Sequence, residues 1–364
     1  MGEIWLTHGK LSIPYGIVNA SVHVEQGRIA AIRSRAPRGA KEINLQGAFL
    51  APGFIDLHIW GDPRVVAREA VKGGATAFLT TLGPAAPEKL AAEVVSHVDA
   101  IRQMTDETGA RCLGLHLEGP FLNPARGGAL PRRWMRPSAM QELRGLAQIA
   151  GNHLKLMTLA PELSGAREII RWCRQHGVVA SLGHSEADAA VAQRAVEAGA
   201  KAVTHVFNGM RPFHHRQPSL VDVALAESRL TTMVIADGVH VSPLAFRLLV
   251  RAKGVDGVAL VTDSIRHQGW DVVERGGAYY ARRGILAGSC LTMIDAVRNA
   301  MRFANLTLHE AVRMASSVPA KLLRLDRVTG SLEVGKRADL VAFDDHFHVH
   351  LTIAGGHIVY KRSA

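Results

Sequence analysis

The sequence predicts an α/β fold: a TIM (β/α)8 barrel joined to a small β-sandwich that both ends of the chain build. Three observations lead there. From residue 52 onward, short apolar runs alternate with helical patterns, which is typical of a parallel sheet covered on both faces. Roughly eight such units follow one another, which favours a closed barrel over an open sheet. No GxGxxG motif follows the first run, which argues against a dinucleotide-binding fold.

Each predicted strand is an apolar run, rich in β-branched residues, that stops at a polar or glycine-rich turn. Segments 87–104 and 185–200 between these runs have the spacing of amphipathic helices. The eight predicted strands span residues 54–59, 75–82, 112–119, 154–160, 178–183, 202–207, 231–236 and 257–262.

The two ends of the chain differ from this repeat. Residues 1–50 and 341–364 alternate short β-like pieces with turns, and neither segment is long enough to form a core alone. We therefore expect them to combine into one small β-sandwich domain, with residues 51–340 forming the barrel domain.

Composition excludes several classes of protein. Only three cysteines occur, far apart, which favours a reduced, cytoplasmic setting over a disulfide framework. The N-terminus lacks the pattern of a signal peptide, and no apolar run approaches the length of a membrane span. The net charge of +11 comes from scattered basic residues, and aromatic residues make up only 5%. Solvated surface, or attraction of a small anionic substrate, explains the charge better than nucleic-acid binding does.

Polar side chains follow most of the predicted strands. Because the carboxyl ends of barrel strands meet on one face, we expect these side chains to form a single site. A lone histidine could equally be a buried structural residue, but several strands ending in this way are hard to explain separately. The residues concerned are Asp56, His58, His116, Glu118, His184, His205, Asn208, Asp237, His240 and Asp263.

At this point the sequence resembles a known family. The segments PGFIDLHIWG, HLEGPFLNPARGGAL, LGHSEAD, THVFNGMRPFHHRQPSL, IADGVHVSP, LVTDSI, LAGSCLTM and GKRADLVAFD are similar, in order and context, to blocks of the N-acetylglucosamine-6-phosphate deacetylases, which belong to the amidohydrolase superfamily. The resemblance extends from about residue 47 to the end of the chain.

The resemblance implies that Glu118, His184 and His205 hold one divalent metal ion. One carboxylate and two imidazoles match a catalytic site with three protein ligands and an open position. Zinc is the first expectation, and iron, cobalt or manganese also suit these ligands. In the family Asp263 would act as the general base that later protonates the leaving amine, and His240 would contact the substrate beside the reacting carbonyl. We interpret Asp237 as an orienting or structural residue, with the structural role favoured.

The resemblance also implies the substrate contacts. Asn208 and Gly209 match positions that meet the sugar phosphate, and the loop of Leu286, Ala287 and Gly288 matches one that closes over the sugar. Arg216 matches an arginine that binds the phosphate from the neighbouring subunit, so a homodimer is expected. An arginine suits this role because it donates two hydrogen bonds in a planar fork.

The chain departs from the family in three places. Many members of the family carry His-x-His or Gln-x-Asn at the end of the first strand, whereas this chain has His58-Ile59-Trp60. The two-histidine arm of a second metal site is incomplete, so we expect one metal, with His58 at most an auxiliary ligand. A family histidine that lies against the substrate is replaced at Leu130, although Ala129 and Leu130 are still expected in the substrate site. The segments 61–74 and 266–284, beside the pocket, are shorter than expected.

The sequence therefore predicts hydrolysis of the acetamide of an N-acetylated amino-sugar phosphate, N-acetylglucosamine 6-phosphate first. A second hypothesis is an amidohydrolase that deacylates another N-acyl amino sugar or a cyclic amide. A non-catalytic relative that only binds its ligand is a third, which the retained Glu118, His184, His205 and Asp263 disfavour.

Overall fold

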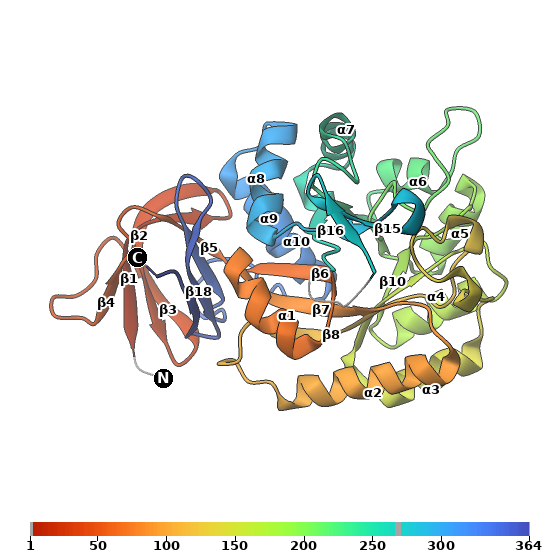
Figure 1. Cartoon of the computed structure of the whole chain (residues 1–364). Helices are drawn as coiled ribbons and strands as arrows, with labels where there is room; N and C mark the ends of the chain where they lie inside the picture. The colour runs from red at the N-terminus through yellow and green to blue at the C-terminus, as the bar shows by residue number, and fades with distance from the viewer. Residues whose placement is uncertain (1–2, 266–270, 364) are drawn as a thin grey trace.

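The computed structural model describes residues 3–265 and 271–363 of the chain. It confirms the predicted architecture, which is an eight-stranded parallel barrel with a mixed sheet built from N- and C-terminal strands. Figure 1 shows this mixed sheet at one side of the barrel, with both termini at the same end of the molecule. Part of segment 266–284, which was expected beside the pocket, falls on residues 266–270, outside the described residues.

The barrel strands are almost wholly buried, because helices cover the outside and side chains fill the inside. Their bounds agree with the sequence within a residue or two at all but one strand. The strands are β6 (Phe54–Trp60), β7 (Ala75–Leu82), β8 (Arg111–Glu118), β9 (Leu154–Leu159), β10 (Val179–Leu182), β11 (Ala202–Val203), β12 (Thr231–Ile235) and β13 (Val258–Val261).

The exception is β11, which was expected to span residues 202–207 and ends instead at Val203. The backbone of His205 and Phe207 takes positive φ angles of 28° and 80°. A left-handed conformation cannot continue a strand, so the chain turns here and presents its polar side chains to the open end of the barrel.

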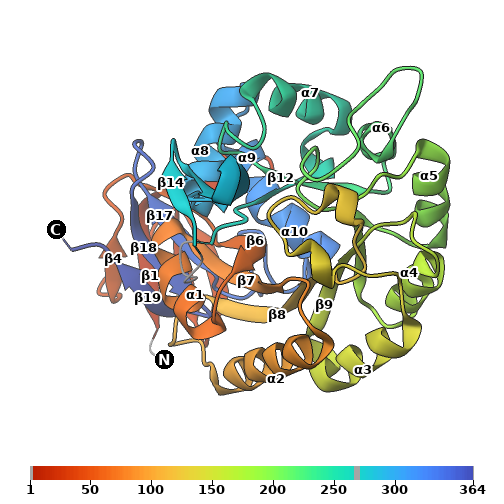
Figure 2. The ribbon, with the colours of Figure 1, turned by 45° about the vertical axis from the view of Figure 1, so that its right-hand side comes forward.

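Helices form an outer ring around the strands (Figure 2). Segments 87–104 and 185–200 were expected to be helical, and α2 and α5 lie within them. Asp188 caps α5 by accepting a hydrogen bond from the backbone of Val191. The helices are α1 (Pro63–Ala70), α2 (Pro87–Gln103), α3 (Met140–Ala150), α4 (Ala166–Gln175), α5 (Ala189–Ala198), α6 (Leu220–Ala226), α7 (Pro243–Lys253), α8 (Met293–Ala304), α9 (Leu308–Ala315) and α10 (Ser317–Leu322).

The barrel closes between β6 and the residues that follow β13. The backbone N–H of Asp263 donates to the carbonyl of His58 at 2.9 Å, and that of Trp60 donates to the carbonyl of Ser264 at 3.0 Å. These two bonds bring Asp263 beside His58 and Trp60, although about 200 residues separate them in the sequence.

The terminal segments pair in one mixed sheet whose apolar face forms a core separate from that of the barrel. Strand β5 pairs with β17, which ties the two ends of the chain together. The strands are β1 (Ile4–Ile13), β2 (Gly16–Glu25), β3 (Arg28–Arg33), β4 (Glu42–Asn44), β5 (Phe49–Pro52), β17 (Leu340–Phe343), β18 (Val349–Ala354) and β19 (His357–Lys361). The domain boundaries at residues 50 and 341 stay a prediction.

A third, three-stranded sheet lies between β13 and α8, and its last strand reaches the open end of the barrel. It comprises β14 (Val273–Arg275), β15 (Ala278–Ala281) and β16 (Ile285–Ser289). In the part of the chain that the structure describes, no helix has the length and hydropathy of a membrane span.

Candidate metal centre

The predicted site residues lie together at the carboxyl end of the barrel. Glu118 is the last residue of β8, while His184, His205 and Asp263 each follow their strands by two residues. These last three have positive φ angles of 47°, 28° and 49°. Residues other than glycine seldom adopt this conformation, and those that do cluster at functional sites. The fold therefore aims three side chains at one point at some cost in backbone strain.

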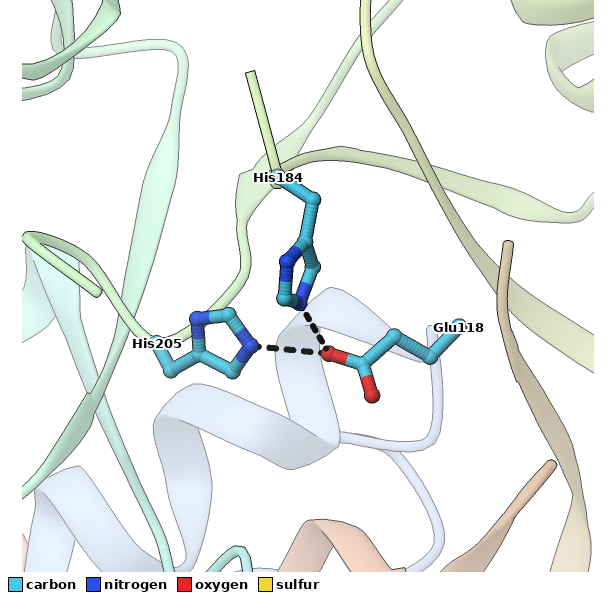
Figure 3. A group of neighbouring side chains, drawn as sticks. All are labelled: Glu118, His184 and His205. Atoms are coloured by element: carbon cyan, nitrogen blue, oxygen red, sulfur yellow. Dashed lines mark hydrogen bonds and ion pairs between the residues drawn. The ribbon is translucent and has the colours of Figure 1, made fainter. Parts of the chain in front are cut away.

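Glu118, His184 and His205 form a compact, buried group (Figure 3). The Nε2 atoms of His184 and His205 lie 3.0 and 2.8 Å from Oε1 of Glu118. One ligand atom from each residue lies within 4.8 Å of the other two. Within the described ranges, no other group of three or more histidine, cysteine or acidic side chains meets this spacing.

The hydrogen bonds around His184 fit a metal ligand. Its Nδ1 lies 2.8 Å from the carbonyl oxygen of Arg126, a group that can only accept a proton. Nδ1 therefore carries the proton, and the lone pair of Nε2 is available to an ion. The same carbonyl fixes the ring plane. A carboxylate and two imidazole nitrogens, buried and convergent, make a donor set that suits a divalent metal.

Gly209 makes room for the His184 ring. Its φ is +62°, and a Cβ atom placed on it would lie 2.8 Å from Nδ1 of His184 and 3.1 Å from the carbonyl oxygen of Arg126. Only glycine allows both the backbone conformation and this close approach.

His58 and Asp263 form a second pair beside these three buried side chains. Nε2 of His58 lies 3.1 Å from Oδ1 of Asp263 and 3.6 Å from Oε2 of Glu118. Burial alone would lower the pKa of His58, but these two carboxylates outweigh it and raise the pKa to about 9. Burial likewise opposes charge on Glu118, but the surrounding histidines, His58 foremost, hold its pKa well below the usual range.

Trp60 occupies the position of the missing second ligand of the first-strand motif. Its indole Nε1 donates a 2.8 Å hydrogen bond to Oδ1 of Asp263. Indole nitrogen is a donor only and cannot bind a metal ion. The pairing was not foreseen from the sequence, because it joins residues 203 positions apart.

Three other strand-end residues have structural hydrogen bonds. His116 lies inside the barrel, where Nε2 contacts the Thr158 hydroxyl at 2.7 Å and Nδ1 contacts the carbonyl of Leu57 at 3.1 Å. Asp56 accepts a hydrogen bond from the Thr262 hydroxyl. Asp237 contacts Nδ1 of His240 at 2.6 Å and also accepts from the backbone of His240, so it holds that ring in place.

A cavity of about 260 Å³ opens above this group. It brings together nearly every residue that the sequence predicted for the site, and adds Trp60, Gly128 and Ile285. The predicted residues that line it are Glu118, Ala129, Leu130, His184, His205, Asn208, Gly209, His240, Asp263, Leu286, Ala287 and Gly288. Arg216 does not line it; its side chain is exposed on the loop before α6.

Comparison with known proteins gives the class first. Residues 49–359 match the model of the amidohydrolase family, and this chain therefore belongs to the amidohydrolases. The N-acetylglucosamine-6-phosphate deacetylase of Bacillus subtilis is 35% identical over 370 residues, covering 94% of this chain and 93% of that protein. Within the amidohydrolases, the chain is a member of the N-acetylglucosamine-6-phosphate deacetylase family.

Two further relatives bear on the site. The deacetylase of Mycobacterium smegmatis, solved as an aspartate-to-alanine variant in complex with N-acetyl-D-glucosamine-6-phosphate, superposes with a TM-score of 0.90 at 29% identity, covering 99% of this chain and all of that chain. An N-acetylgalactosamine-6-phosphate deacetylase of Escherichia coli O157:H7 is 33% identical over 90% of this chain and 91% of that protein.

Proposed function

We propose that this protein is a metal-dependent deacetylase that hydrolyses the acetamide of N-acetylglucosamine 6-phosphate to glucosamine 6-phosphate and acetate. The observation that carries the proposal is the buried group of Glu118, His184 and His205, with Asp263 beside it, at the floor of one cavity. Relatives that align over nearly the whole chain support the substrate class.

We propose that Glu118, His184 and His205 hold one divalent ion, zinc first. When bound there, the ion would polarise the amide carbonyl and lower the pKa of water toward ~7. The donors come from three separate strands, so the barrel fixes them before any substrate arrives. Trp60 stands where a second ion would need a ligand, which supports a single ion.

Asp263 moves the proton in this proposal. Its carboxylate accepts a proton from the attacking water and returns it to the nitrogen of the leaving amine. The hydrogen bond from Trp60 and the contact with His58 both involve Oδ1, which leaves Oδ2 for the water. His240, held by Asp237, would lie beside the carbonyl oxygen of the substrate.

The remaining cavity residues would bind the sugar. Asn208 and Gly209 lie on the turn after β11, and Leu286, Ala287 and Gly288 lie on β16, and both segments line the cavity of the proposed sugar site. We propose that Arg216, exposed in one chain, reaches the phosphate in the neighbouring chain of a homodimer. A cytoplasmic setting stays a prediction.

The galactosamine epimer is the second candidate substrate, because a relative of similar coverage is named for it. Leu130 also favours retaining this second candidate substrate, since the chain has an apolar side chain where the family is expected to have a histidine. The cyclic-amide and non-catalytic hypotheses have no observation in their favour beyond this divergence.

A hydrolysis screen tests the proposal. Acetate release is measured on metal-quantified protein with N-acetylglucosamine, N-acetylgalactosamine and N-acetylmannosamine, each with and without a 6-phosphate. We expect kcat/KM to be highest for N-acetylglucosamine 6-phosphate. Release from none of the six would overturn the deacetylase proposal, and a preference for the galactosamine epimer would replace the substrate.

The role of Arg216 has its own test. Arg216→Ala should lower kcat/KM for the phosphorylated sugar by about ten-fold or more, chiefly through KM, because one charge-assisted contact is lost. The unphosphorylated sugar should barely respond. Equal losses on both sugars would remove Arg216 from the phosphate site.

A further inference from the structure

A second cavity lies at the opposite end of the barrel. Its volume is about 700 Å³, and its lining comes from the amino-terminal ends of β8 to β12, with α10 and the turn after it on one side. Arg111 begins β8, and Lys201 lies immediately before β11. Barrel chemistry takes place at the carboxyl ends of the strands, so this basal cavity is separate from the metal centre.

The basal cavity is strongly basic. Seven lysine and arginine residues line it against a single acidic residue, Asp256. Asp256 is already paired with Arg313, and one lining cation, Arg229, is paired with Glu227. Among the described residues the other six have no carboxylate within ion-pair distance. They are Arg111, Lys155, Arg174, Lys201, Lys321 and Arg324.

Arg111 differs from the exposed cations of the lining, which are Arg174, Lys201, Arg229, Lys321 and Arg324. Its Nε and Nη2 atoms are buried and have no hydrogen-bond partner. A buried N–H without a partner costs free energy, and the cost is larger for a charged group. Burial lowers the pKa of Arg111, against the pull of Asp339. An anion in the cavity would stabilise the charged form of this guanidinium.

Two lysines of the lining, Lys155 and Lys201, are anchored at the amino-terminal ends of β9 and β11. The stem of Lys155 packs on Gly114, where a Cβ atom would lie 2.7 Å from the Lys155 Cγ. The backbone of Lys201 is fixed by hydrogen bonds to Ala180 and Thr231 on the two adjacent strands. Cations placed by strands lose less freedom on binding than those on loops.

The lining favours a small organic ligand over a nucleic acid. The cavity is concave, and aliphatic side chains such as Leu113, Val318 and Leu322 provide apolar surface between the cations. Among the described lining residues there is no phenylalanine, tyrosine or tryptophan on which bases could stack. A few convergent polar groups on an apolar wall are typical of small-molecule sites.

We propose that the basal cavity binds a small organic phosphate carrying at least two phosphate groups. Lys155 and Lys201 contact one phosphate as point charges, and the buried Arg111 adds to the positive potential of the cavity. Lys321 and Arg324, across the cavity, meet the second phosphate. This site does not depend on the proposed deacetylase activity.

Calorimetric titration with fructose 1,6-bisphosphate, and with fructose as the neutral control, tests the site. The metal-loaded protein is kept in saturating glucosamine 6-phosphate, which occupies the sugar site if the proposed function is right. We expect saturable binding of the bisphosphate at one site per chain and none of fructose. The Lys155→Gln/Lys201→Gln double variant should bind about ten-fold or more weakly, since one lost charged contact already changes affinity by about that factor.

The matched control is Lys41→Gln/Lys361→Gln, which removes the same charge from exposed lysines near and on the terminal sheet. Circular dichroism and thermal unfolding confirm that each variant is folded. Unchanged binding in this control supports the basal site. Equal weakening of bisphosphate binding in both double variants would show that the ligand responds only to the net charge of the protein. That result would overturn the proposal, as would the absence of binding to the wild-type protein.

Discussion

The indole Nε1 of Trp60 donates a 2.8 Å hydrogen bond to Oδ1 of Asp263. The two residues come from opposite ends of the barrel sequence, on β6 and after β13, and meet where the barrel closes. The same oxygen lies 3.1 Å from His58. The proposed general base is thus oriented by the residue at which this chain departs from the first-strand motif expected of the family.

Removing the indole donor should weaken catalysis without removing the metal. Trp60→Phe keeps an aromatic ring but loses a hydrogen bond to a charged acceptor, which is worth roughly 1.5–3 kcal/mol. We expect kcat to fall about ten-fold or more at unchanged metal content. Trp172→Phe, on α4 where Trp172 stacks on His176, is the control and should keep full activity. A Trp60→Phe enzyme with wild-type kcat would show that the bond has no catalytic effect.

Asp263 itself should matter more than the residue that orients it. Asp263→Asn can still accept from Trp60 but cannot take a proton, so turnover should fall by about 10²–10⁴. Metal content, measured by elemental analysis, and thermal stability should stay close to wild type. A variant that retains more than about a tenth of the rate would exclude Asp263 as the proton shuttle.

Metal stoichiometry separates the three ligands from His58. Protein purified with excess zinc should hold about one ion per chain, as expected for a site with three protein ligands. His184→Ala and His205→Ala should each abolish tight binding, because two donors cannot retain the ion. His58→Ala should weaken it at most. Two ions per chain at full occupancy would contradict the single-ion prediction.

The barrel and most of the site could be predicted from the sequence, because the carboxyl ends of barrel strands converge on one face whatever the structure of the loops. Glu118, His184 and Asp263 could be placed from strand position alone. The Trp60 contact could not, since it depends on which strands close the barrel. The basal cavity was missed for a related reason: Arg111 and Lys201 look like scattered surface charges in the sequence and become neighbours only through the strand order.

Stability should depend on pH through His97. Its Nδ1 lies 3.1 Å from the Thr80 hydroxyl, which itself donates to the carbonyl of Gly61. Burial lowers the pKa of His97 to about 4, from an ordinary value of 6.5. Below about pH 6.5 the unfolded chain binds a proton that the folded chain does not, so this contribution is present above pH 6.5 and is lost as the pH falls toward about 4.

The effect is measured by comparison with His97→Gln, which keeps a donor for Thr80 but does not titrate. At about 1.4 kcal/mol per pKa unit, the loss in free energy of unfolding is up to roughly 3 kcal/mol. Urea unfolding between about pH 7.5 and pH 4.5 should show the wild type losing stability relative to the variant. If the difference in free energy of unfolding between wild type and variant is constant across that range, His97 has the same pKa in the folded and the unfolded chain.

The last prediction concerns Gly209, which the sequence assigned to the substrate and the structure places against His184, a proposed metal ligand. A Cβ atom at this position would lie 2.8 Å from Nδ1 of His184, closer than non-bonded atoms tolerate. Gly209→Ala should push the ring away from Glu118 and weaken metal binding, by about ten-fold or more if His184 loses its place in the site.

The positive φ of Gly209 adds backbone strain to the same variant, so the control must reproduce strain without contact. Gly254 serves, because its φ is +68° and a Cβ atom there would meet nothing within 4 Å. With a ψ of 167°, Gly254 lies in a region that essentially only glycine adopts, so Gly254→Ala should cost about 1–3 kcal/mol of stability and leave metal affinity unchanged. Competition with a chromogenic chelator measures the affinity of both variants. If both variants bind the ion as tightly as the wild type, the ring of His184 can shift without loss of metal affinity. Gly209 would then have a role in sugar binding only.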